Sequence, residues 1–234
     1  MRPNYTHALI IGAGSGLSAS LARRFQAEGL RITLASRTVE DLGPLCQETG
    51  ATAHPLDASD AGAVAALFET LDTTGAPDVV VYNPSARVRG PIQELDPEAV
   101  RKALEITGYG GFIAAREAAK RMIPARHGAL LFTGASAGVK GFANSSVFAM
   151  GKFALRGLAQ ALARELHPQG IHVGHFVIDG GIRNPQRPER VEAAENPDSL
   201  LDPDAIAEAY WQFLAQDRSA WAWEIELRPW VERF

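Results

Sequence analysis

Hydrophobic residues along the chain fall into two alternating patterns. Short runs of mostly aliphatic residues, typical of buried strands, occur seven times. Longer segments between them have apolar residues three and four positions apart, as Leu155, Leu158 and Leu162 do, which predicts helices with one buried face. The predicted strands are Ala8–Ile11, Arg31–Ala35, Thr52–His54, Asp78–Tyr82, Ala129–Thr133, His172–Ile178 and Trp223–Leu227. The predicted helices are Gly16–Glu28, Val39–Gln47, Ala61–Leu71, Pro97–Met122 with a break near Gly108, Ser145–Leu166 and Asp204–Ala215.

This alternation predicts a parallel sheet, because parallel neighbours are joined by helical crossovers. We therefore expect an α/β fold, a three-layer, doubly wound Rossmann-type parallel sheet of about seven strands. A length of 234 residues fits one domain over residues 1–234. The exception to the alternation is 183–199, a segment rich in Pro, Glu and Asn without an apolar period. Its length predicts a mobile lid or a partly disordered loop over 183–199.

The charge balance narrows the range of partners. The formal net charge is −4 and the pI is about 5.9, so the chain lacks the basic face expected of a nucleic-acid-binding protein. The first seven residues are polar and the apolar run after them ends at Gly12, a pattern of neither a secretion signal nor a membrane span. We therefore expect a cytoplasmic protein with a small-molecule partner and no nucleic acid or membrane partner. The single cysteine, Cys46, cannot form an internal disulfide.

A glycine-rich turn links the first predicted strand to the first predicted helix. Glycines let the backbone approach a pyrophosphate, whose charge is stabilised by free amides at the start of a helix. The order of strand, glycine turn and helix favours dinucleotide binding over a plain tight turn, which needs fewer glycines. The candidate cofactor contacts in this turn are Gly12, Gly14, Ser15, Gly16 and Leu17.

Two further segments follow predicted strands on the same side of the sheet. The second strand ends in Ser36 and Arg37, where an acid would favour the free ribose 2′-hydroxyl of NAD and an arginine favours the 2′-phosphate of NADP. We therefore expect NADP(H) in preference to NAD(H), the alternative being a solvated arginine at a helix start. Asp57 and Ala58 follow the third strand, where Asp57 either accepts a hydrogen bond from adenine or caps a helix.

Together these segments resemble the short-chain dehydrogenase/reductase family of single-domain type, over almost the whole chain. Gly12 and Gly16 match the first two glycines of the family's TGxxxGxG loop, whereas Ile11 replaces its threonine and Ser18 its third glycine. Asn83 and Pro84 lie where the family has NNAG, and the segment 179–182 lies where it has a Pro-Gly turn. The resemblance implies cofactor contacts at Asn83, Pro84, Lys152, Gly180 and Ile182.

The catalytic residues match the family less well. The family's Asn, Ser and Tyr fall on Thr107, Ala135 and Phe148, and its lysine is retained as Lys152. Ser136 replaces the serine only if the loop is offset by one residue. A phenyl ring cannot exchange a proton, so the resemblance implies an atypical site with Lys152 and Ser136 as catalytic candidates. Other candidate donors, each with a structural alternative, are Ser145, Ser146, Tyr109 and Asp179.

No pair of residues suggests a metal centre, since His172 and His175 lack a carboxylate or cysteine at useful spacing. Arg183, Arg187 and Arg190 either meet an anionic ligand or are solvated. The segment 221–234 carries large aromatic residues to the terminus, which together with the resemblance implies a homodimer or homotetramer.

Two functions remain open. One is an NADP(H)-dependent oxidoreductase that transfers hydride to or from a small carbonyl or alcohol. The other is a non-catalytic nucleotide-binding sensor or inactive partner subunit. A third possibility is that cofactor binding has also been lost.

Overall fold

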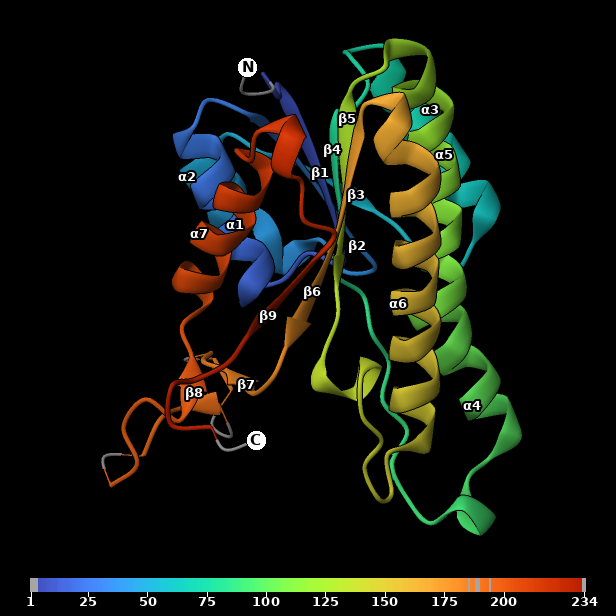
Figure 1. Ribbon diagram of the computed structural model, residues 1–234, viewed down its shortest axis with the longest axis vertical. Helices are drawn as coiled ribbons and strands as arrows, with labels where there is room; N and C mark the ends of the chain where they lie inside the picture. Colours follow the sequence, from blue (N-terminus) through green and yellow to red (C-terminus); the bar gives the residue numbers. More distant parts are fainter. Residues whose placement is uncertain (1–3, 185, 188–189, 194, 233–234) are drawn as a thin grey trace.

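A seven-stranded parallel sheet forms the centre of the computed structural model, which describes residues 4–184, 186–187, 190–193 and 195–232 (Figure 1). The strand order is β3-β2-β1-β4-β5-β6-β9, and every neighbouring pair is parallel. The strands are β1 His7–Ile11, β2 Arg31–Ser36, β3 Thr52–Pro55, β4 Val79–Tyr82, β5 Gly128–Thr133, β6 Ile171–Ile178 and β9 Glu224–Leu227. The predicted strands and the doubly wound fold are confirmed, and in each strand one end is exact and the other is shifted by one residue.

Helices cover both faces of this sheet, giving the three layers expected from the sequence (Figure 1). One face is covered by α1 Leu17–Ala27, α2 Gly43–Thr49 and α7 Pro203–Leu214. The other is covered by α3 Ala61–Asp72, α5 Gly110–Ala125 and α6 Ser146–Leu166, with α4 Pro97–Leu104 leading into α5. Each interface has its own cluster of buried apolar side chains, because a parallel sheet is apolar on both faces.

Two local features differ from the expected elements. The helix expected over Val39–Gln47 begins as a 3₁₀ turn, Glu40–Leu42, and α2 starts at Gly43 with a proline in its first turn, where Pro is favoured. The segment expected to form a lid begins and ends beside a small parallel sheet, β7 Gly181–Ile182 and β8 Leu200–Leu201. Two-residue strands show no sequence period. Part of 183–199 lies outside the described residues, and its mobility stays a prediction.

The aromatic residues near the C-terminus are used mainly within the chain. Trp221 stacks on His172 with a centroid distance of 4.3 Å, and the Arg156 guanidinium lies 5.6 Å from the Trp223 ring centroid. Trp230 is 82% exposed, as expected of this segment, although its indole N–H donates a hydrogen bond to the Asp198 carboxylate at 3.1 Å. Phe234 lies outside the described residues.

The break expected near Gly108 is a π-helical turn, Glu105–Tyr109, which joins α4 to α5 without ending the helix. The Tyr82 hydroxyl at the end of β4 donates a hydrogen bond to the Ile106 carbonyl of this turn. Gly110 makes the close approach possible, because a Cβ atom there would collide with the Tyr82 hydroxyl and lie 2.6 Å from the Ala58 carbonyl oxygen.

Replacing Gly110 with alanine will therefore lower the free energy of unfolding by about 1–3 kcal/mol, the usual cost of overpacking. The matched control is Gly157→Ala on α6, where an added Cβ meets no atom within 4 Å. That change will raise stability by about 0.5–1 kcal/mol, since alanine restricts the unfolded chain. Urea unfolding of both variants measures the difference, and equal stabilities would contradict the tight packing at Gly110.

Candidate active site

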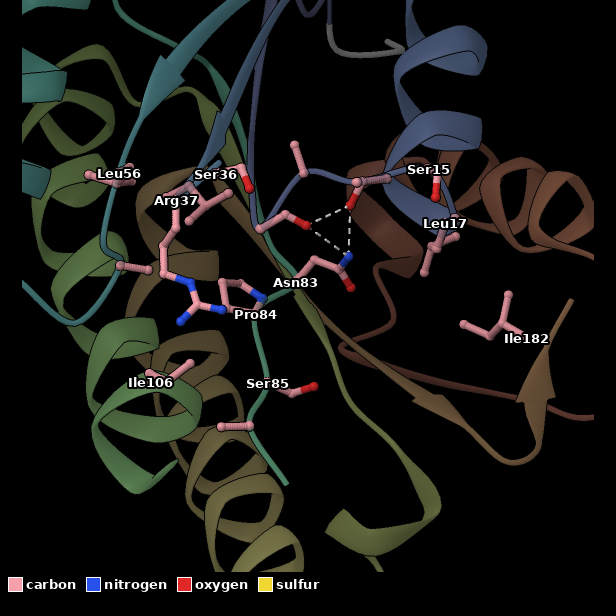
Figure 2. Close-up of a pocket in the computed structure, with 18 of the residues that line it drawn as sticks. Ser15, Leu17, Ser36, Arg37, Leu56, Asn83, Pro84, Ser85, Ile106 and Ile182 are labelled. Atoms are coloured by element: carbon pink, nitrogen blue, oxygen red, sulfur yellow. Dashed lines mark hydrogen bonds between the residues drawn. The ribbon is translucent and has the colours of Figure 1, made fainter. Parts of the chain in front are cut away.

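A cavity of about 600 Å³ lies at the carboxyl ends of the parallel strands, where α/β folds bind ligands (Figure 2). Its volume is in the range of small-molecule and cofactor sites. The structure brings twelve of the fourteen expected cofactor contacts to this one cavity. They are Gly12, Gly14, Ser15, Gly16, Leu17, Ser36, Arg37, Asp57, Ala58, Asn83, Pro84 and Ile182.

Close contacts with Asn83 and Pro84 hold the glycine loop in place. Gly12 has φ +82°, and a Cβ atom there would lie 2.8 Å from the Pro84 nitrogen, so glycine is required for two reasons. The Ser18 hydroxyl donates to the Gly12 carbonyl at 3.0 Å, and the Asn83 amide donates to the Ser18 hydroxyl at 2.7 Å (Figure 2). Ser18 therefore bonds inside the loop rather than facing a phosphate.

The cavity side of the same loop is open. A Cβ atom on Gly14 would meet nothing within 4 Å, although Gly14 lines the cavity. Gly16 is the N-cap of α1 and provides no side-chain oxygen to cover the first turn. A bare backbone beside a helix start is the arrangement that binds a pyrophosphate, so these residues fit a dinucleotide.

Arg37 lies at the far side of this cavity, after β2. Figure 2 shows Arg37 among the residues that line the cavity, and none of the described residues forms an ion pair with it. Asp57 lines the cavity, but its carboxylate accepts hydrogen bonds from the Ser59 hydroxyl at 2.6 Å and the Ser59 amide at 2.9 Å. These bonds, together with the charge of Arg37, lower the pKa of Asp57. Asp57 thus makes a local turn contact and lines the cavity. It does not cap a helix, because the cap of α3 is Asp60, whose carboxylate accepts from the Gly62 and Ala63 amides.

A second cavity of about 130 Å³ continues from the first, sharing Asn83, Ser85 and Ile182 with it. It contains Lys152 and Gly180, the other two expected cofactor contacts, together with Phe148 and Ala135. The spacing of four residues places Phe148 and Lys152 on one face of α6, as expected.

Lys152 is buried, with only 2% of its surface exposed. Its ammonium donates a hydrogen bond to the Thr133 carbonyl at 2.6 Å and lies 5.9 Å from the centroid of the Phe148 ring. Burial, with a smaller contribution from the nearby charge of Arg87, lowers the pKa of Lys152 to about 7. Lys152 can therefore exchange a proton near neutral pH.

The other catalytic candidates lie elsewhere. Ser136 begins a 3₁₀ turn and lines neither described cavity, whereas Ala135 does line one. Thr107 is buried in the π turn, where its hydroxyl accepts a hydrogen bond from the Ala86 amide at 3.0 Å. Thr107, on which the resemblance placed the family's asparagine, therefore anchors the loop after β4.

The alternative proton donors are also outside the lining of both described cavities. Tyr109 is 51% exposed and stacks on Phe112 with a centroid distance of 6.1 Å. The Asp179 carboxylate lies 3.5 Å from the Lys140 ammonium. Ser145 and Ser146 begin α6.

The two histidines of β6 are buried and have separate partners. His172 Nε2 lies 3.0 Å from the Ala222 carbonyl, and His175 Nδ1 lies 3.0 Å from a Glu224 carboxylate oxygen. Burial lowers the pKa of His172 to about 3 and that of His175 to about 4, so both are neutral at pH 7. Among the described residues, no three His, Cys, Asp or Glu side chains are grouped to hold a metal ion. In the same part of the chain, no helix is long and apolar enough to cross a membrane.

Arg87, which lines the smaller cavity, was not identified from the sequence. Of the three arginines considered there as anion contacts, Arg190 lines the smaller cavity, Arg187 lines the larger one, and Arg183 pairs with Asp202. The Arg87 guanidinium lies 4.2 Å above the centroid of the Phe148 ring. Its position three residues after Pro84, in a loop at the carboxyl end of β4, was the one available sequence signal.

Comparison with known proteins assigns this chain to a family. The family model described as short chain dehydrogenase matches residues 6–192. A cis-4-hydroxycyclohexanecarboxylate dehydrogenase of Sinomonas cyclohexanicum is 30% identical over 226 residues, which cover 91% of this chain and 90% of that protein. A cyclic-di-GMP-binding biofilm dispersal mediator protein of Escherichia coli is 32% identical over 167 residues, covering 70% of this chain and 68% of that one.

Solved structures agree with this assignment. The crystal structure of a short-chain dehydrogenase from Rhodopseudomonas palustris is 35% identical, with a TM-score of 0.82 over 97% of this chain and 100% of that one. A metagenomic short-chain oxidoreductase in complex with NADP, 24% identical, has the same fold with a TM-score of 0.82 over 97% of this chain and 98% of that one. With its glycine loop and seven-stranded parallel sheet, the chain belongs to the short-chain dehydrogenase/reductase family.

Proposed function

We propose that this protein is an NADP(H)-dependent oxidoreductase that transfers hydride to or from a small carbonyl or alcohol, with Lys152 as its proton-exchanging residue. One observation carries the proposal. The cavity that gathers the expected nucleotide contacts shares Asn83, Ser85 and Ile182 with the smaller one, which is lined by the buried Lys152. Dehydrogenases among the similar proteins support the same reaction class.

The preference for NADP(H) rests on the end of β2. Arg37 follows Ser36 there, and its cation lines the cavity without an ion-pair partner among the described residues. An arginine binds a 2′-phosphate through charge-assisted hydrogen bonds, whereas NAD(H) is favoured by an acid at this place. The residues present therefore fit the phosphorylated nucleotide.

The chemistry divides between the nucleotide and Lys152. When bound, NADPH supplies the hydride that converts a carbonyl carbon into an alcohol carbon. The carbonyl oxygen then gains negative charge and needs a proton. The Lys152 ammonium gives that proton to the oxygen, and the resulting amine recovers a proton from solvent. In the direction of oxidation, the neutral amine accepts the alcohol proton.

Phe148 takes no part in this proton transfer, because its ring has no exchangeable proton. A positioned acid or base contributes a factor of about 10²–10⁴ to the rate. Because Phe148 stands where the family has its tyrosine, Lys152 must provide this contribution. The buried side chain of Lys152 lies on the same face of α6 as Phe148, which is the placement that this role requires.

The variant Phe148→Tyr tests whether the lost hydroxyl limits the enzyme. We expect kcat/KM for carbonyl reduction to rise by less than about tenfold, because Thr107 and Ala135 still lack the hydrogen-bonding groups that assist a catalytic tyrosine. Steady-state kinetics of the two proteins give the answer. A gain of about 10² or more would contradict Lys152 as the proton-exchanging residue.

A panel of small ketones, aldehydes and alcohols with NADPH or NADP tests the function itself, with Lys152→Ala as the control. The proposal expects turnover of at least one compound by the unmodified protein and a large loss in the control. Nucleotide binding without any turnover above the control would instead support a non-catalytic sensor or partner subunit.

We also propose that the chain assembles as a homodimer or homotetramer. Tyr109, Phe112, Met150 and Phe153 are 45–52% exposed on the outer sides of the π turn, α5 and α6. Large apolar side chains gathered on helices favour association. Light scattering after size exclusion measures the molar mass, and a monomer at micromolar concentration would oppose this proposal.

A further inference from the structure

The smaller cavity carries a strong excess of positive charge. Arg87, Lys152 and Arg190 line it, and none of its described lining residues is acidic. Asp57 lines the larger cavity and Asp179 lies between Ile178 and Gly180, which line the smaller one, but both acids have other partners. Asp179 pairs with Lys140, and Asp57 accepts hydrogen bonds from Ser59. The positive charge is therefore not neutralised by the described part of the chain.

Arg87 is held by an aromatic ring rather than by a carboxylate. Its guanidinium lies 4.2 Å from the Phe148 centroid, a cation–π contact that fixes the position of the cation. No hydrogen bond or ion pair within the described residues uses the side chains of Arg87 or Arg190. A guanidinium stacked by its face keeps its edge N–H groups available, and those groups match the two oxygens of a carboxylate.

The surroundings of Arg87 favour the arrival of an anion. Partial burial is the main cause that lowers the pKa of Arg87, and the charges of Arg190, Arg89 and Arg187 add to it. A bound anion would relieve this repulsion. The Thr107 hydroxyl, which accepts from the Ala86 amide at 3.0 Å, holds the residue just before Arg87 and so positions the arginine.

The cofactor's phosphates are not the natural ligand of Arg87. The glycine loop and Arg37 lie in the larger cavity, whereas Arg87 lines only the smaller one with Phe148 and Lys152. Both cations lie near the Phe148 ring in this cavity, Arg87 at 4.2 Å and Lys152 at 5.9 Å from its centroid. One small molecule can therefore place an anionic group at Arg87 and a reacting oxygen at Lys152.

We infer that Arg87, stacked on Phe148 and assisted by Arg190, is a carboxylate-binding subsite, so that the substrate is a small hydroxy- or oxo-carboxylate. This inference rests on the proposed function, since it places the carboxylate beside the hydride-transfer site. Phe148 then has a role of its own: it provides the apolar ring face on which the substrate-binding arginine is seated.

Calorimetric titration of the full chain tests the inference with two probes that share one ring, benzoate and benzyl alcohol, each in the presence of NADP. Hydrogen bonds to a charged group contribute about 1.5–3 kcal/mol, so benzoate should bind at least about tenfold more tightly than benzyl alcohol. Arg87→Met should remove this preference while leaving benzyl alcohol affinity within about twofold. Arg89→Met, an equal loss of charge in the same loop but outside both described cavities, should retain most of it.

The outcomes separate the two proposals. Failure of the unmodified protein to bind NADP would defeat the proposed function. NADP binding with equal affinity for the two probes, or a preference that survives Arg87→Met, would defeat the carboxylate subsite alone. If Arg87→Met does not fold, the subsite is tested by Arg190→Met and by the salt dependence of benzoate binding to the unmodified protein. Both Arg190→Met and added salt should weaken benzoate binding. Unchanged benzoate affinity in either measurement would overturn the subsite.

Discussion

Substitution of Lys152 by methionine will lower the rate of carbonyl reduction by about 10²–10⁴, the usual contribution of a positioned proton donor. Methionine keeps an unbranched chain of similar length but has no proton to give. The change removes the hydrogen bond to the Thr133 carbonyl as well as the proton source. Single-turnover reduction under saturating NADPH measures the loss at the chemical step.

The pH profile provides the sharper form of this prediction. The pKa of Lys152 is about 7, so its ammonium form is lost as the pH rises through that value. Reduction by the unmodified protein should therefore fall about tenfold per pH unit above neutrality. Lys152→Arg, which stays charged, should lose this dependence. A flat profile in the unmodified protein would contradict a proton-donating Lys152.

The stability of Lys152→Met shows whether a loss of activity is due to unfolding. Because the folded pKa of Lys152 lies below the unfolded one, the unfolded chain binds the extra proton between these values, and stability rises with pH there. Removing a buried amine removes this dependence and should not destabilise the protein at pH 7. A variant that is inactive because it is unfolded would be recognised by its thermal unfolding curve.

Replacing Arg37 with aspartate will reverse the nucleotide preference. NADPH affinity should fall by about 10² or more, because charge-assisted hydrogen bonds worth about 1.5–3 kcal/mol each are exchanged for repulsion between two anions. NADH affinity should rise, since an acid can accept from the free ribose hydroxyl. Calorimetry with both nucleotides measures the two changes.

Arg89→Asp is the matched control for this charge reversal, since Arg89 is exposed and lines neither described cavity. It should change the affinities for NADPH and NADH by similar, small amounts. An equal effect of Arg37→Asp on the affinities for the two nucleotides would show that Arg37 does not bind the 2′-phosphate. It would not contradict nucleotide binding itself.

The strands and the glycine loop could be predicted because their signals are local. Buried parallel strands are continuous apolar runs, and a glycine with positive φ, such as Gly12, marks its own turn. The four-residue spacing in the sequence also predicts that Phe148 and Lys152 lie on one helix face. These patterns need no knowledge of distant residues.

The remaining features depend on contacts between distant segments. The two-residue strands β7 and β8 have no period, and they pair only because the fold brings Gly181 beside Leu200. Ser136 and Ala135 are neighbours, and only the turn geometry decides that Ala135 faces the cavity. The stacking of Arg87 on Phe148 joins residues 61 positions apart in the chain, so no local pattern signals it.

Equilibrium titration of the unmodified protein with NADPH and with NADH tests whether the larger cavity binds NADP(H) in preference to NAD(H). We expect saturable binding of one NADPH per chain. NADH should bind at least about tenfold more weakly, the difference that one charge-assisted contact provides. No binding of either nucleotide, or tighter binding of NADH, would contradict this expectation.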